Sequence, residues 1–163
     1  MKNKKGFTLI ELIIVIAIIA ILAGAIFVAI DPARRIHEAH NARRASDIAT
    51  ILDGVKAYQA DHSGTHYFTV AGMSDDSNYL IGTSDSSCIV DCSVPLQSDC
   101  VDLSDIGTDY LAVIPRDPTD GTDERTGYAI RKDSTGAITV IACESEGEGP
   151  GGAGEPPDLM ISR

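Results

Sequence analysis

The sequence has few aromatic and few basic residues. Its 163 residues include no tryptophan, three phenylalanines and five tyrosines, so a folded domain has little bulky aromatic volume for its core. Lysine and arginine total 13 against 24 acidic residues, for a formal net charge of −11. Proteins that bind nucleic acid concentrate basic side chains on one surface. The shortage of basic residues therefore argues against nucleic acid as a direct ligand.

A set of side chains suited to catalysis is also missing. Serine and aspartate are abundant because the loops are polar, but no convincing partner set for a nucleophile accompanies them. His37 and His40, and His62 and His66, have spacings that can ligate a metal on a helix, yet no Cys or carboxylate pattern completes either site. We expect surface histidines and a protein that is not an enzyme.

Apolar residues are concentrated near the N-terminus. Phe7–Ile30 is a run of 24 residues with one charge, Glu11. At 1.5 Å per residue it forms roughly 36 Å of helix, enough to cross a bilayer. Three lysines precede the run and few charges follow it, which places the N-terminus in the cytoplasm. A cleaved secretory signal is a poorer interpretation, because its apolar region is usually about 7–15 residues long.

The start of the chain resembles a known leader. Residues 4–11, KKGFTLIE, join basic residues, Gly6, Phe7 and Glu11 to a long apolar helix. This pattern is similar to the class III leader of type IV pilins and type II secretion pseudopilins. The resemblance implies that a membrane prepilin peptidase cuts between Gly6 and Phe7 and methylates the new N-terminus. It also implies that Glu11 pairs with the N-terminal amine of a neighbouring subunit.

Elementary electrostatics agrees with a role for Glu11 in assembly. Opposite charges about 4 Å apart attract by about 4 kcal/mol at an effective dielectric of 20. Desolvation cancels much of this, so the pair sets register more than it adds net stability. A lone carboxylate is costly in lipid and satisfied in a filament. The alternative is that Glu11, near the start of the run, reaches the cytoplasmic headgroups at little cost.

An amphipathic helix is predicted after the apolar run. The segment up to Asp61 carries one apolar stripe at helical spacing, which comprises Ile48, Ile51, Leu52, Val55 and Tyr58. Pro32 has no N–H and should kink the helix, with Gly24 a second flexible point. We expect one long helix over residues 7–61, bent near 31–32.

The amphipathic segment also carries basic residues. They lie at helical offsets from Glu38 and Asp47 and comprise Arg34, Arg35, Arg43 and Arg44. We interpret them as a solvated helix face with local ion pairs. Contact with acidic patches on a neighbouring subunit is the alternative.

Short apolar runs after His62 predict β-strands at 67–70, 110–114, 128–130 and 137–142. The last two flank a turn ending at Gly136 and should form a hairpin. An antiparallel sheet would cover the apolar stripe of the helix. The expected fold class is α+β, with a long N-terminal helix (transmembrane, then amphipathic) packed on a small antiparallel β-sheet head.

Residues 114–128 resemble a loop of major pseudopilins, which carry Pro-(basic)-Asp-Pro before a Gly-Tyr strand. In those proteins this region binds calcium. The carboxylates that could supply the oxygen ligands preferred by Ca²⁺ are Asp117, Asp120, Asp123 and Glu124. Their spacing does not fit an EF-hand, and an acidic turn without metal is the alternative.

All four cysteines follow the apolar run, so they are expected outside the cytoplasm. Cys88, Cys92, Cys100 and Cys143 favour two disulfides, with three possible connectivities. We favour one bridge within residues 88–100 and one from that loop to Cys143. A zinc site is a poorer interpretation, because Cys-x3-Cys-x7-Cys fits no common zinc finger.

Composition divides the chain into five segments. They are a prepilin leader (1–6), a transmembrane and assembly helix (7–30), an amphipathic helix half (31–62), a β-rich globular head (63–143) and an acidic tail (144–163). The tail is of low complexity, so we expect it to be mostly disordered.

The expected function is a structural subunit of a type IV pilus-like surface filament. The resemblance implies processing by prepilin peptidase, polymerisation with copies of itself through the N-terminal helix, and dedicated assembly machinery. The precursor would span the cytoplasmic membrane once, before an extracellular pilus or a periplasmic pseudopilus forms. The alternatives are a pseudopilin of a type II secretion system and a membrane-anchored binding module that never polymerises.

Overall fold

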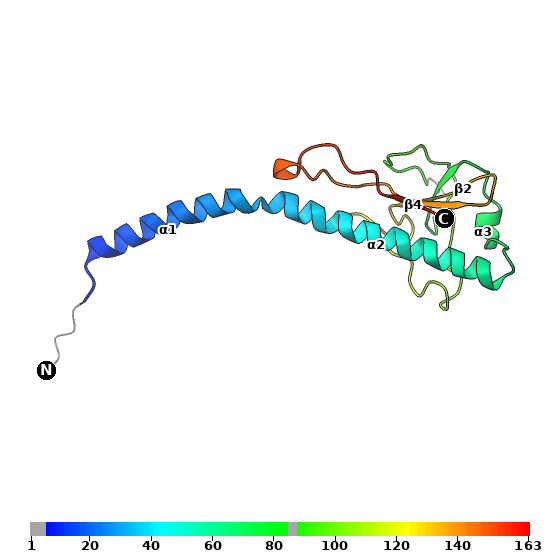
Figure 1. Ribbon diagram of the computed structural model, residues 1–163, viewed down its shortest axis with the longest axis horizontal. Helices are drawn as coiled ribbons and strands as arrows, with labels where there is room; N and C mark the ends of the chain where they lie inside the picture. Colours follow the sequence, from blue (N-terminus) through cyan, green and yellow to red (C-terminus); the bar gives the residue numbers. More distant parts are fainter. Residues whose placement is uncertain (1–5, 85–87) are drawn as a thin grey trace.

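The computed structural model of the chain describes residues 6–84 and 88–163. The leader lysines Lys2, Lys4 and Lys5 lie outside the described residues. Figure 1 shows a long helical arm that ends in a small head of helix and sheet. In chain order the elements are α1 (Leu9–Ile30), α2 (Pro32–Asp61), α3 (Phe68–Ala71), β1 (Asn78–Leu80), β2 (Tyr128–Lys132), β3 (Ile138–Ala142), the 3-10 helix η1 (Pro150–Gly152) and β4 (Met160–Ser162).

The helical arm is broken at one residue. Asp31 adopts a left-handed conformation, with φ 47° and ψ 71°, between the end of α1 and the start of α2. Pro32 then occupies the first helical position, where a missing N–H costs nothing. The predicted bend near residues 31–32 is therefore present, whereas α1 continues through Gly24 without interruption.

The head contains a four-stranded antiparallel sheet in the order β1-β2-β3-β4. Strands β2 and β3 form the predicted hairpin. Its turn has a left-handed Gly136 (φ 85°), and the carboxylate of Asp133 accepts bonds from the backbone N–H groups of Thr135 and Ala137. The predicted α+β fold class is confirmed.

The apolar stripe of α2 forms the centre of the head. Ile51, Leu52 and Val55 are completely buried and share one core cluster with Ile130 and Val140 of the sheet. Full burial of such side chains is worth about 1.5–3 kcal/mol each. The second half of α2 is therefore held by the sheet.

Two of the four predicted strands are wrong. Residues 67–70 instead contribute to α3, because Tyr67 and Val70 are buried three residues apart, the spacing of a helical turn. Residues 110–114 form no strand: the N–H of Leu111 bonds back to the carbonyl of Gly107, so the chain turns there. Strand β1, three residues long, was not predicted.

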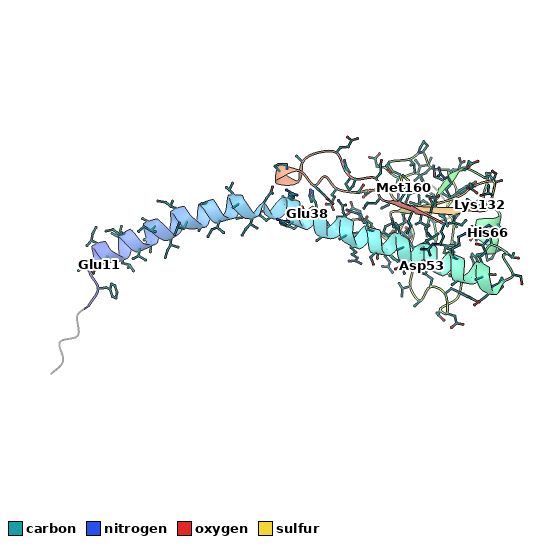
Figure 2. All side chains as sticks on the ribbon, viewed as in Figure 1. Glu11, Glu38, Asp53, His66, Lys132 and Met160 are labelled. Carbon is teal, nitrogen blue, oxygen red and sulfur yellow. A yellow bond between two sulfur atoms is a disulfide. The ribbon has the colours of Figure 1, made fainter. Side chains whose placement is uncertain are left out.

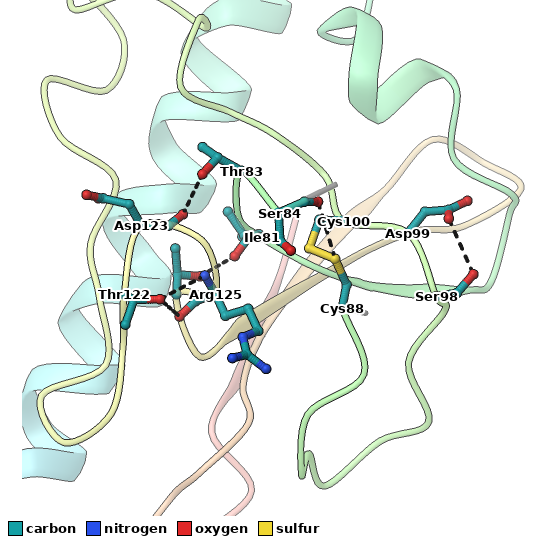
Figure 3. Close-up of a disulfide and its surroundings, with 11 residues drawn as sticks. Ile81, Thr83, Ser84, Cys88, Ser98, Asp99, Cys100, Thr122, Asp123 and Arg125 are labelled. Carbon is teal, nitrogen blue, oxygen red and sulfur yellow. Dashed lines mark hydrogen bonds between the residues drawn. A yellow bond between two sulfur atoms is a disulfide. The ribbon is translucent and has the colours of Figure 1, made fainter. Parts of the chain in front are cut away.

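Two disulfides tie the 88–100 loop together and to the sheet. Cys88 pairs with Cys100, and Cys92 pairs with Cys143 directly after β3. The sequence left open which cysteine pairs with Cys143, and the structure assigns Cys92 to it. Figure 3 shows the Cys88–Cys100 bridge near the 122–125 turn, where the hydroxyl of Thr83 donates to the carbonyl of Asp123.

The tail differs from the disordered segment expected from its composition. Strand β4 adds to the edge of β3, and Arg163 exchanges two backbone hydrogen bonds with Ile138. Between β3 and β4 the chain makes an excursion along α2 towards the helix break (Figure 1). The composition of the tail did not predict its order. The tail is ordered by specific contacts to α2 and β3 and not by a hydrophobic pattern that can be read from the sequence.

Candidate functional site

Helix α1 has no partner for its apolar surface within the described chain. It contains no buried residue, and its large apolar side chains are 46–80% exposed. Figure 2 shows them projecting on several sides of a helix that extends away from the head. Its 22 residues span roughly 33 Å. Among the described residues, one helical stretch is long and apolar enough to cross a membrane, and it includes α1.

Glu11 is held at the start of α1 by a capping box. Its Oε2 accepts bonds from the backbone N–H of Thr8 (2.8 Å) and from the Thr8 hydroxyl (2.7 Å). In return, the Glu11 N–H donates to the Thr8 hydroxyl at 3.3 Å. Nothing in the described part of the chain donates to the other oxygen, Oε1. One carboxylate oxygen therefore accepts hydrogen bonds at the start of the helix, and the other remains available to accept a further hydrogen bond.

The expected processing residues lie directly beside this cap. Gly6 and Phe7 precede Thr8 in extended chain and are exposed, with Phe7 91% exposed. A peptidase could therefore reach the Gly6–Phe7 bond without unfolding α1. A new amine at Phe7 would arise one residue from the Thr8–Glu11 cap.

Arg44 on α2 is the centre of a second polar cluster and is completely buried. Its guanidinium binds Asp117 through two hydrogen bonds, Nε to Oδ2 (2.6 Å) and Nη2 to Oδ1 (3.0 Å). It also donates to Glu146 at 2.7 Å, Asn41 at 3.0 Å and Thr119 at 3.2 Å. All five guanidinium N–H groups therefore have an acceptor. The cluster joins α2, the 117–119 segment and the tail.

The cluster keeps its acids ionised. Burial acts to raise the pKa of Asp117, but hydrogen bonds from Arg44 and Thr119 outweigh it and hold this pKa below its ordinary value. Burial likewise opposes the bonds from Arg44 and His40 that lower the pKa of Glu146. The pKa of Arg44 is raised, since its acidic partners outweigh its desolvation.

The prediction of a solvated basic face is right in part. Arg34 and Arg35 both bind Glu38, at 2.7 and 2.8 Å, and Arg43 lies 3.7 Å from Asp47. For Arg44 the prediction is wrong. Its position four residues before Ile48 continues the buried stripe, a signal that could have been recognised in the sequence.

The structure does not assemble the expected calcium ligands. Both oxygens of Asp117 bind Arg44, and Asp123 forms an ion pair with Arg116. No group of three or more His, Cys, Asp or Glu side chains that could hold a metal occurs among the described residues. Two of the four, Asp117 and Asp120, line one cavity of about 200 Å³ together with Glu144. Glu124 is exposed.

The histidines take separate structural roles. His37 and His40 lie against the tail, His62 stacks on Tyr58 with ring centroids 3.9 Å apart, and His66 lies beside Gly136. Neither pair is part of a metal-binding group among the described residues. His37 and His40, which were expected to be surface residues, are partly exposed (28% and 31%) and also contact the tail.

Comparison with known proteins identifies the N-terminal segment. Residues 1–27 match the family described as the prokaryotic N-terminal methylation motif, which is the class III prepilin leader of type IV pilins and pseudopilins. No curated protein and no solved structure matches the chain. The motif supports a pilin-like or pseudopilin precursor, and together with the apolar helix it fits a membrane-anchored one. Such pilins and pseudopilins are structural proteins rather than enzymes.

Proposed function

From the prepilin leader and the unpartnered α1, we propose that the protein is a structural subunit of a type IV pilus-like surface filament. Prepilin peptidase cuts between Gly6 and Phe7 and methylates Phe7. Copies of the processed chain then polymerise through α1. The observation that carries the proposal is an apolar helix of 22 residues, directly behind the leader, with no buried residue.

The apolar side chains of α1 are covered by different partners in the membrane and in the filament. In the membrane, lipid covers them, and association depends on packing and polar contacts because lipid is as apolar as the helix. Outside the membrane, the same surface is unfavourable in water. Helices of neighbouring copies provide the cover in a filament, and the hydrophobic effect then makes the helix bundle very stable.

Glu11 provides the polar contact in this proposal. Thr8 occupies Oε2, and Oε1 remains to accept a hydrogen bond from the methylated Phe7 amine of a neighbour. The carboxylate compensates that cation in a region of low dielectric. The capping box therefore fixes the direction from which the neighbour's amine approaches.

Processing also changes the charge of the subunit. Loss of residues 1–6 removes Lys2, Lys4 and Lys5 and takes the formal charge from −11 to −14. The leader lysines hold the N-terminus of the precursor in the cytoplasm. The head, its disulfides and its acidic surface are then on the outer side of the cytoplasmic membrane, where assembly machinery extracts the subunit.

Shearing of intact cells followed by mass spectrometry of the sheared and membrane fractions tests the proposal. We expect a peptide that begins at methylated Phe7 in the sheared fraction. The same peptide confined to membranes would instead indicate a pseudopilin. Intact Met1–Gly6 in every fraction would contradict processing and leave a single-pass membrane anchor.

A matched pair of variants tests the role of Glu11. Glu11→Gln removes the carboxylate charge and should abolish sheared filaments while the processed chain accumulates in the membrane. Glu155→Gln makes the same change at an exposed tail position and should assemble normally. Equal filament yields from the two variants would exclude an essential charge pair at Glu11.

A further inference from the structure

The first turns of α2 are not covered by the sheet. The buried residues of this helix begin at Asn41, so the segment 32–40 has none. Among the described residues, the polar contacts to 32–40 from outside the helical arm all come from the tail. Figure 1 shows the tail running back along this part of α2 to the helix break. We call residues 146–152 the strap.

The strap is anchored to α2 at Glu146. Its carboxylate oxygen Oε2 lies 2.8 Å from Nδ1 of His40 and accepts a bond from Arg44 at 2.7 Å. Asn41 also binds the main chain of Glu146 in both directions, donating to its carbonyl at 2.7 Å and accepting from its N–H at 3.0 Å. This anchor joins the buried Arg44 cluster to the strap.

The other end of the strap is bound to the helix break. The N–H of Gly151 donates to Oδ2 of Asp31 at 2.7 Å. The other oxygen of the same carboxylate, Oδ1, accepts from the N–H of Arg34 and caps α2. One aspartate therefore begins α2 and binds the strap, at the left-handed residue that separates the two helices.

His37 contacts the strap between these anchors. Its Nδ1 lies 2.8 Å from the carbonyl of Gly147. Gly152, with φ +75°, lies so close that an added Cβ would be 2.6 Å from Cε1 of the His37 ring. Only glycine fits this contact without moving the imidazole or the strap.

The strap is itself fixed to the head. It lies within the excursion between β3 and β4, which pair with each other. The two sides of the excursion are joined by hydrogen bonds from Ser145 to the carbonyl of Pro157 (2.6 Å) and from Gly149 to that of Ala153 (2.6 Å). Movement of the strap would therefore require this whole excursion to move.

We propose that the strap is a clamp that holds the first turns of α2 and the Asp31 break to the head, and so sets the direction in which α1 leaves it. A short helical extension without tertiary contacts is marginal in water. A single non-helical residue between two helices also leaves their relative direction free unless something spans it. The strap supplies the contacts to 32–40 and binds Asp31 itself.

Two variants loosen the clamp, and each has a matched control. Gly152→Ala places a methyl group against His37. The control Gly154→Ala also lies at a left-handed position of the excursion (φ +102°), but it is outside the strap and no atom lies closer than 3.7 Å to its Cβ. Glu146→Gln weakens the anchor at Arg44, whereas Glu155→Gln removes a charge from an exposed position of the same tail.

The measurements use the full chain, unassembled in detergent micelles. Hydrogen exchange reports on the α2 amides at 36–43. Electron-spin distance measurements use labels on cysteines introduced at Leu22 of α1 and Ser134 of the head. The four native cysteines are in disulfides and do not compete for label. Because no filament is required, the outcome is independent of whether the chain polymerises.

We expect Gly152→Ala to accelerate exchange at 36–43 at least about tenfold over Gly154→Ala and to broaden the distance distribution. Glu146→Gln should do the same relative to Glu155→Gln, while amides of β2 and β3 keep their protection. Unchanged exchange and distances in Gly152→Ala would overturn the proposal. Accelerated exchange only together with loss of protection in β2 and β3 would overturn it too, since it would reflect unfolding of the head.

Discussion

Helices α1 and α2 follow each other directly in the chain but have opposite surroundings. The 22 residues of α1 include no buried residue, whereas the 30 residues of α2 include seven. The stripe of α2 is covered by the sheet of the same chain. No described residue of the chain covers the apolar surface of α1, which is the surface that the proposed filament would bury.

The charged residues of the two helices also differ in burial and in where their partners come from. Arg44 of α2 is completely buried, and its guanidinium has five acceptor atoms, which come from Asn41 of α2, from the 117–119 segment and from Glu146 of the tail. α1 carries one charge, Glu11, in its first turn, where a local capping box satisfies it. A charge can be buried in the head because its partners are fixed there. On α1 the described chain offers the Glu11 carboxylate only the local partner Thr8.

Replacement of Arg44 should give the largest loss of head stability. Arg44→Met leaves the buried Asp117 without its cation, and breaking a buried pair in this way costs about 3–5 kcal/mol. The free energy of unfolding from urea titration measures it. Arg43→Met is the control, because Arg43 is 62% exposed and should change stability by less than about 1 kcal/mol. Similar losses for both would show that Arg44 acts only as a surface charge.

Removal of a disulfide should give the next largest loss of head stability, and the two bridges should differ in the size of that loss. Cys92 and Cys143 are 51 residues apart and Cys88 and Cys100 are 12 apart, so the chain-entropy model predicts losses of about 4 and about 3 kcal/mol. Paired Cys→Ala variants of each bridge, compared by thermal unfolding, measure the order. The helix content of α1 should not change, because neither bridge involves it. The reverse order of stabilities would contradict the entropic account.

The same leucine-to-alanine change in each helix gives the most direct comparison of α1 with α2. Leu52→Ala in α2 removes a completely buried side chain and should destabilise the head by about 3 kcal/mol. Leu12→Ala in α1, where Leu12 is 61% exposed, should leave head unfolding unchanged and lower the yield of sheared filaments. A filament yield insensitive to Leu12→Ala would show that this position of α1 is not packed against a neighbour.

The parts of the molecule that follow a periodic pattern could be predicted from the sequence. The apolar stripe from Ile48 to Tyr58, the β2–β3 hairpin around Gly136 and the break at Pro32 each combine a repeat with a marked turn or helix start. These features are determined by residues close together in the chain, so a short stretch of sequence is enough to predict them.

The remaining features depend on contacts between distant segments. Its spacing from Ile48 places Arg44 on the buried face of α2, but its acidic partners are distant in sequence, with Asp117 73 residues away. The order of the tail has the same origin, because its anchor at Asn41 spans 105 residues. The resemblance of residues 114–128 to a calcium-binding loop left a metal site and an acidic turn both open, because sequence alone could not show that Arg44 binds Asp117.

A change of pH should have the smallest effect on the stability of the head. It acts through the Arg44 cluster, which lies on α2 and not on α1. Hydrogen bonds from Arg44 hold the pKa values of Asp117 and Glu146 below their ordinary values of about 3.9 and 4.3. A carboxylate with a lowered pKa in the folded state stabilises that state fully above its unfolded pKa, and this contribution is lost as the pH falls. The unfolding free energy of the head should therefore be level above about pH 5 and decline below pH 4.

Two glutamine variants test whether this decline comes from the Arg44 cluster. Glu146→Gln removes one of the two titrating partners, so urea titrations at a series of pH values should show a shallower decline than in the unmodified chain. Glu155→Gln lies outside the cluster and should keep the full slope. If both variants retained the unmodified slope, the acids that control head stability would lie elsewhere, and the tail would be attached to α2 without an electrostatic contribution from Glu146.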